Sequence, residues 1–130
     1  MSVLADLVVQ RERARRDLGA FLELVGRDER GARLVLADHH RAWLDHLTYC
    51  WGRPDPLLAA TWSHWGSGKT SIAVGLIAHA IGQRPELRAA LVCSSEALAK
   101  SRLRAVRQLI ESPAYRALYP GVVPSATADK

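Results

Sequence analysis

Apolar residues recur at helical spacing in several stretches of the chain. Leu18, Phe21, Leu22 and Val25 stand at relative positions 0, 3, 4 and 7, which is typical of one face of an amphipathic helix. A similar stripe precedes them, so the first 26 residues predict one long helix or two short ones, ending at Gly26. Further helices are expected over 38–51, 69–82 and 96–110, with a short one near 115–119.

Short apolar runs between these helices are typical of buried strands. Residues 57–62 lead into a glycine-containing loop, residues 89–93 precede the next helix, and residues 34–36 form a shorter extended piece. The order strand, loop, helix, strand, helix predicts a βαβ unit with parallel strands. We therefore expect an α/β fold.

The loop before the helix at 69–82 carries the most specific chemistry. Its glycines, Gly66 and Gly68, let the backbone turn tightly and bring its amides close to phosphate oxygens. Lys69, the candidate catalytic residue, supplies positive charge to the β- and γ-phosphates, and the Thr70 hydroxyl can ligate Mg²⁺. The pattern matches a Walker A phosphate loop in which Ser63 replaces the first glycine. The sequence thus predicts binding of ATP and Mg²⁺ by Ser63, His64, Trp65, Gly66, Ser67, Gly68, Lys69, Thr70 and Ser71.

Composition and charge narrow the function classes. The 130 residues include 18 Lys and Arg against 13 Asp and Glu, and the net charge of +5 suits an anionic partner such as a nucleotide or nucleic acid. The longest apolar stretch, residues 72–81, is too short to span a bilayer, and no basic segment precedes an apolar one at the N terminus. We therefore expect a cytoplasmic protein without a membrane partner.

Together these motifs resemble the N-terminal ATPase domain of large terminase subunits, the motors that package DNA into tailed-bacteriophage heads. The resemblance covers residues 18–120 and rests on Leu36–Leu44, Gly66–Thr70, Leu91–Ala99 and Tyr115–Pro120. It implies a phage or prophage protein in the host bacterial cytoplasm. In the complete motor, its partners would be double-stranded DNA, the small terminase subunit and the portal protein.

The resemblance also implies an incomplete P-loop NTPase-like parallel sheet and three segments. These are a helical N-terminal segment (1–33), a partial P-loop ATPase domain (34–120) and a flexible tail (121–130). An adenine-contacting motif precedes the P-loop in the family, and this role falls on His40. The family mostly has Arg just before the first loop glycine, where this chain has Trp65. The charge on the γ-phosphate must then come from elsewhere, or hydrolysis is weak, and Trp65 could pack against the loop.

The acids of a P-loop ATPase are not evident. Hydrolysis uses an apolar strand ending in Asp and an acid that orients water, and no acid after Cys93 ends an apolar run. We expect an ATP-binding fragment that does not hydrolyse ATP alone.

Two alternatives remain open. One is another P-loop ATP-binding or helicase-like module. The other is a basic DNA- or partner-binding domain without a nucleotide role. Residues 11–17 are either a solvated helix face or a basic arm that contacts DNA or a partner subunit. Residues 94–96 lie where related motors and helicases place a motif near nucleic acid, and Lys100, Arg104 and Arg107 could extend that contact; the alternative is a helix cap followed by a solvated basic face.

Overall fold

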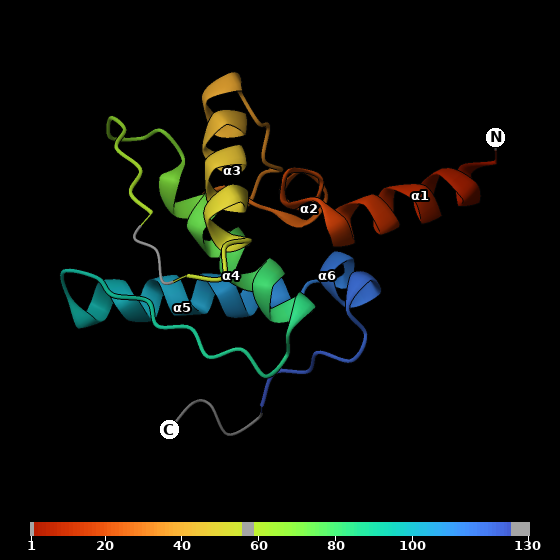
Figure 1. The fold of residues 1–130 in the computed structure, drawn as a ribbon. Helices are drawn as coiled ribbons and strands as arrows, with labels where there is room; N and C mark the ends of the chain where they lie inside the picture. The colour runs from red at the N-terminus through yellow and green to blue at the C-terminus, as the bar shows by residue number, and fades with distance from the viewer. Residues whose placement is uncertain (1, 56–58, 126–130) are drawn as a thin grey trace.

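The computed structural model describes residues 2–55 and 59–125, and over these residues the protein is all-helical (Figure 1). The expected helices are confirmed, including the division of the N-terminal stretch into two. Ser95 caps the helix that follows it, since its hydroxyl accepts from the backbone N–H of Leu98 at 3.3 Å. None of the described helices is long and apolar enough to cross a lipid bilayer. The helices are α1 Val3–Arg16, α2 Leu18–Val25, α3 Asp38–Trp51, α4 Lys69–Gln83, α5 Glu96–Glu111 and α6 Pro113–Leu118.

The expected α/β fold with a P-loop NTPase-like parallel sheet is wrong. The described residues contain no β-strand, and their one bridge is an isolated antiparallel pair between Arg27 and Arg33. Residues 34–36, 59–62 and 89–93 run without regular structure, while the start of the expected strand at 57–62 lies outside the described residues. The side chains of Trp62 and Val92 are 86% and 92% exposed.

The physical reason is a lack of partners. A sheet of two short strands leaves one edge of each strand unpaired and covers too little apolar surface, so it is at best marginally stable in water. The expected tail at 121–130 has no regular structure through residue 125, and its last five residues lie outside the described part.

Helix α4 is surrounded by helices instead of lying on a sheet. It is apolar on nearly all sides and buries Ile72, Val74 and Ala78 among the other helices. Gly75 allows the closest approach, since a Cβ there would overlap the side chain of Leu22 on α2. The apolar residues around α4 are thus covered by α2, α5 and α6.

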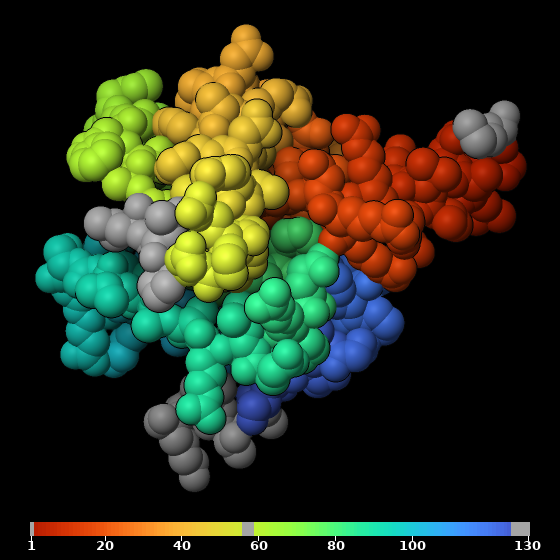
Figure 2. All heavy atoms as spheres, viewed as in Figure 1, coloured from red at the N-terminus to blue at the C-terminus, as the bar shows by residue number. Residues whose placement is uncertain are grey.

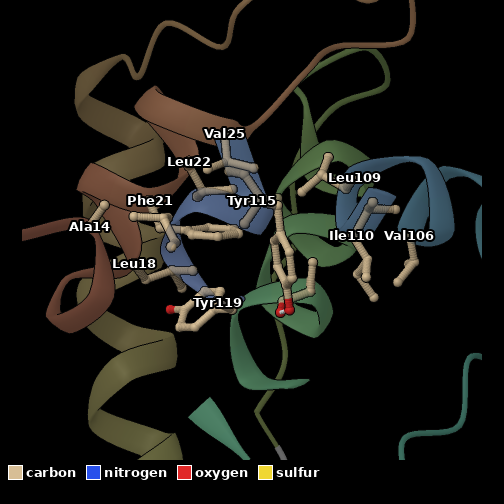
Figure 3. Packing of buried hydrophobic residues seen from close by; sticks show 14 of the residues in the cluster. Ala14, Leu18, Phe21, Leu22, Val25, Val106, Leu109, Ile110, Tyr115 and Tyr119 are labelled. Atoms are coloured by element: carbon tan, nitrogen blue, oxygen red, sulfur yellow. Dashed lines mark hydrogen bonds between the residues drawn. The ribbon is translucent and has the colours of Figure 1, made fainter. Parts of the chain in front are cut away.

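Two buried tyrosines, Tyr115 in α6 and Tyr119 just after it, pack in the centre of the core (Figure 3). Tyr115 is fully buried, and its hydroxyl donates a 2.8 Å hydrogen bond to the carbonyl of Ala78 on α4. The Tyr119 hydroxyl lies 3.1 Å from Nδ1 of His79, and the Phe21 ring lies 4.8 Å from the His79 ring. Phe21 and Tyr119, which are distant in the sequence, therefore share one core.

Helix α1 projects from this body (Figures 1 and 2). Its N-terminal half leaves Val3, Leu4 and Val8 between 65% and 76% exposed. A single residue, Asp17, joins it to α2: its backbone N–H caps α1, and its side chain accepts from Ala20 N at 2.6 Å.

Candidate phosphate-binding loop

Two glycines with a left-handed backbone conformation lead the loop into α4. Gly66 has φ 78° and Gly68 has φ 84°, conformations in which a Cβ is strained. Gly68 is the N-cap of α4, and no side chain caps this helix. The first turn of α4 therefore presents its backbone amides, with the positive end of the helix dipole, on the side of the loop.

The ammonium group of Lys69 lies inside the loop. Its Nζ donates to the carbonyl oxygens of Ser63 at 2.8 Å and His64 at 2.7 Å, and to Oγ of Ser67 at 3.2 Å. Ser67 is buried, and its hydroxyl donates to the His64 carbonyl at 2.8 Å. The loop is thus folded around the charge of its own lysine.

His40 on α3 contacts the loop directly. Its Nδ1 accepts from the backbone N–H of Ala37 at 2.9 Å, so its Nε2 carries the proton and donates to the Ser67 carbonyl at 2.8 Å. The Trp43 ring packs edge-on against the imidazole, with ring centres 5.4 Å apart. The structure therefore brings together two sites that the sequence places 27 residues apart.

The residues before the first glycine take part in the loop's hydrogen bonds through their backbone carbonyls. Trp65 is 96% exposed, so its side chain does not pack against the loop. The His64 side chain is exposed, while its carbonyl is part of the loop's hydrogen-bond network. These residues belong to the lime-green lobe that stands beside α3 in Figure 2.

Thr70 and Ser71, in the first turn of α4, border a cavity of about 440 Å³. Both residues are half-buried. The opposite walls come from the connection after α2 and from one face of α5. The lining residues are Arg27, Asp28, Glu29, Thr70, Ser71, Val74, Ser101, Arg102, Arg104, Ala105 and Gln108.

The basic face expected on α5 is partly neutralised within the helix. Lys100 pairs with Glu96 at 2.6 Å, and Arg107 pairs with Glu111 at 2.9 Å. In the N-terminal basic stretch, Glu12 pairs with both of its arginine neighbours on the following turn. Each pair is exposed and adds little to stability, but it reduces the charge available to nucleic acid.

Sequence reasoning missed three residues near the loop. Trp43 stands three positions after His40 on α3, a helical spacing that could have indicated their contact. Arg27 and Arg102 carry no such signal, because only the packing of α5 beside the connection after α2 brings them to Thr70. No group of three or more potential metal-ligating side chains occurs within the described ranges.

No protein-family model, curated protein or solved structure matches this chain.

Proposed function

We propose that the loop from Ser63 to Ser71 binds the phosphate groups of ATP with Mg²⁺. We further propose that the chain is the ATP-binding portion of a viral DNA-packaging motor of the large-terminase kind. The motor's DNA, its small subunit and its portal protein are partners of the complete assembly in this proposal.

The contact between His40 and Ser67 carries the proposal. The family resemblance assigns His40 to adenine contact and residues 63–71 to phosphate contact, without reference to a structure. The two regions meet through a 2.8 Å hydrogen bond. A nucleoside triphosphate has a base for the region of His40 and a phosphate chain for the loop.

The residues present fit such a ligand. The uncapped first turn of α4 offers backbone amides and a favourable dipole to phosphate oxygens. Lys69 supplies the charge once a phosphate oxygen replaces the carbonyls that now accept from it. The Thr70 hydroxyl, beside the cavity, is the group that would ligate Mg²⁺, and the metal would neutralise charge on the phosphates.

The proposal is for binding without turnover by this chain. Two acids, Asp28 and Glu29, line the cavity near Thr70, but both are engaged. The Asp28 carboxylate accepts from the backbone N–H groups of Arg30 and Ala32, each at 2.8 Å, and Glu29 pairs with Arg102. Neither follows an apolar strand, as the catalytic acid of a P-loop ATPase does, so the proposal gives neither a role in hydrolysis.

Tryptophan fluorescence provides the test. Because Trp62 and Trp65 are exposed on the loop, titration with ATP·Mg²⁺ should change the emission of the full chain. Lys69→Ala should weaken binding about tenfold or more, the loss expected for a charge-assisted phosphate contact. Lys100→Ala, which removes a lysine paired with Glu96 on α5, is the matched control and should bind ATP normally.

Two results would count against the proposal. Equal ATP affinity in Lys69→Ala and in the unmodified chain would remove the loop from the binding site. Salt-sensitive DNA binding that survives Lys69→Ala, with no ATP response, would favour the basic binding domain without a nucleotide role.

A further inference from the structure

The cavity beside Thr70 contains more positive charge than the loop motif accounts for. Arg102 and Arg104 enter it from α5, and Arg27 enters from the connection after α2. Its volume of about 440 Å³ falls in the range of small-ligand sites. Arginine suits phosphate because its planar guanidinium can donate two parallel hydrogen bonds.

The three guanidinium groups differ in how they are held. Arg27 donates to the carbonyls of Val25 at 3.1 Å and Gly26 at 2.7 Å, which fixes its position. Among the described residues, Arg102 pairs with Glu29 alone, at 3.5 Å. Within the part of the chain that the structure describes, Arg104 makes no hydrogen bond or ion pair.

The Arg102–Glu29 pair is easily exchanged. At 3.5 Å it is longer than a strong charge-assisted hydrogen bond, and the Glu29 side chain is 72% exposed. Glu29 can therefore move into water at little cost when another anion approaches Arg102.

We infer that this cavity is a phosphate subsite continuous with the glycine loop, in which Arg102 and Arg104 contact phosphate oxygens after Glu29 leaves Arg102. The inference rests on the proposed function, because it assigns the cavity to the same nucleotide. It also identifies a source for the positive charge that Trp65 does not supply at the loop.

The arrangement makes opposite predictions for the acid and the arginines. Arg104 and Arg102 attract the phosphates, so removing either should weaken binding. Glu29 competes with the phosphates for Arg102, so removing its charge should strengthen binding. A purely structural Arg102–Glu29 pair would instead make Glu29→Gln neutral or harmful.

Calorimetric titration of the full chain with ATP·Mg²⁺ and, separately, with pyrophosphate tests this directly. Arg104→Gln and Arg102→Gln should each weaken binding of both probes about three- to tenfold. Glu29→Gln should tighten binding about two- to fivefold. The matched control is Arg88→Gln, which removes one exposed arginine outside the cavity and should leave both affinities unchanged.

The two proposals fail in different ways. If ATP binds and depends on Lys69, while Arg104→Gln and Glu29→Gln bind like the unmodified chain, the subsite is refuted and the loop function stands. If Lys69→Ala has no effect but the cavity variants shift pyrophosphate affinity in the stated directions, the cavity binds phosphate independently of the loop. The substituted side chains lie at the surface or at the cavity edge, so each variant should fold normally. Circular dichroism of each variant checks this.

Discussion

The Nε2–H group of His40 donates to the carbonyl of Ser67 at 2.8 Å, and this bond joins α3 to the glycine loop. A buried serine whose carbonyl has a fixed donor cannot change its loop conformation freely. Helix α3 therefore helps to set the shape of the loop before any ligand binds.

Replacement of His40 should loosen the loop. His40→Ala leaves the Ser67 carbonyl and the Ala37 amide without their partner, which should cost about 1 kcal/mol of unfolding free energy. Hydrogen exchange of residues 64–68 should accelerate. His46→Ala, an exposed change on the same helix, is the control and should alter neither quantity. Unchanged loop exchange in His40→Ala would show that the bond does not order the loop.

The two loop glycines should tolerate alanine differently. Both have positive φ, so Gly66→Ala should cost about 1 kcal/mol from backbone strain alone. Gly68→Ala should cost more, about 2 kcal/mol, because its Cβ would also lie 3.2 Å from Nε2 of His40. Chemical denaturation measures both, with Gly121→Ala as an unstrained control in open space.

A combined variant isolates the His40 contact. In a His40→Ala background the crowding disappears, so Gly68→Ala should then cost no more than Gly66→Ala. An additive result would place the extra cost elsewhere.

Stability should fall as the pH drops below 6.5 because of His79. Burial lowers the pKa of this imidazole from 6.5 to about 4, although the Asp17 carboxylate opposes the shift. The unfolded chain then binds more protons than the folded chain between these values. The contribution is complete above pH 6.5 and is lost as the pH falls toward 4.

Urea unfolding at pH 7.5 and pH 4.5 should reveal this contribution, on the order of 2 kcal/mol after allowance for the partly exposed ring. His79→Gln should reduce the difference between the two conditions, whereas His46→Gln should keep it. Equal pH dependence in His79→Gln and the unmodified chain would exclude His79 as its source.

The contact of α2 with α4 should not accept a methyl group. Gly75→Ala forces the new Cβ against Leu22, and the overpacking should outweigh the gain in helix propensity, for a net loss of about 1–2 kcal/mol. In a Leu22→Ala background the same change should be neutral or stabilising. A destabilising effect of equal size in both backgrounds would contradict this packing.

The helices of this protein can be predicted from sequence because their signals are local. Leu18, Phe21, Leu22 and Val25 share a face whatever the rest of the chain does, and Ser95 caps α5 by reaching only three residues ahead. The absence of a sheet could not be predicted from such local signals. The apolar run ending at Trp62 has strand composition, but a strand exists only with a partner, and residues 59–62 find none.

The candidate site likewise contains residues that local motifs predict and residues that they do not. Gly66, Gly68 and Lys69 follow a short motif whose geometry is largely local, and the two glycines have the left-handed backbone of tight turns. The family resemblance gave His40 a role toward adenine, but no sequence pattern predicted its contact with the loop. Arg102 reaches the cavity because α5 packs beside α4, a relationship that no short motif records.

The junction at Asp17 has a mechanical consequence. Because one residue ends α1 and begins α2, no flexible linker separates the projecting arm from the core. Arg15 adds a brace, donating from the last turn of α1 to the Leu118 carbonyl of α6 at 3.0 Å. A force applied at the exposed N-terminal end of α1 would thus pass through Asp17 to the core around Phe21 and Tyr115.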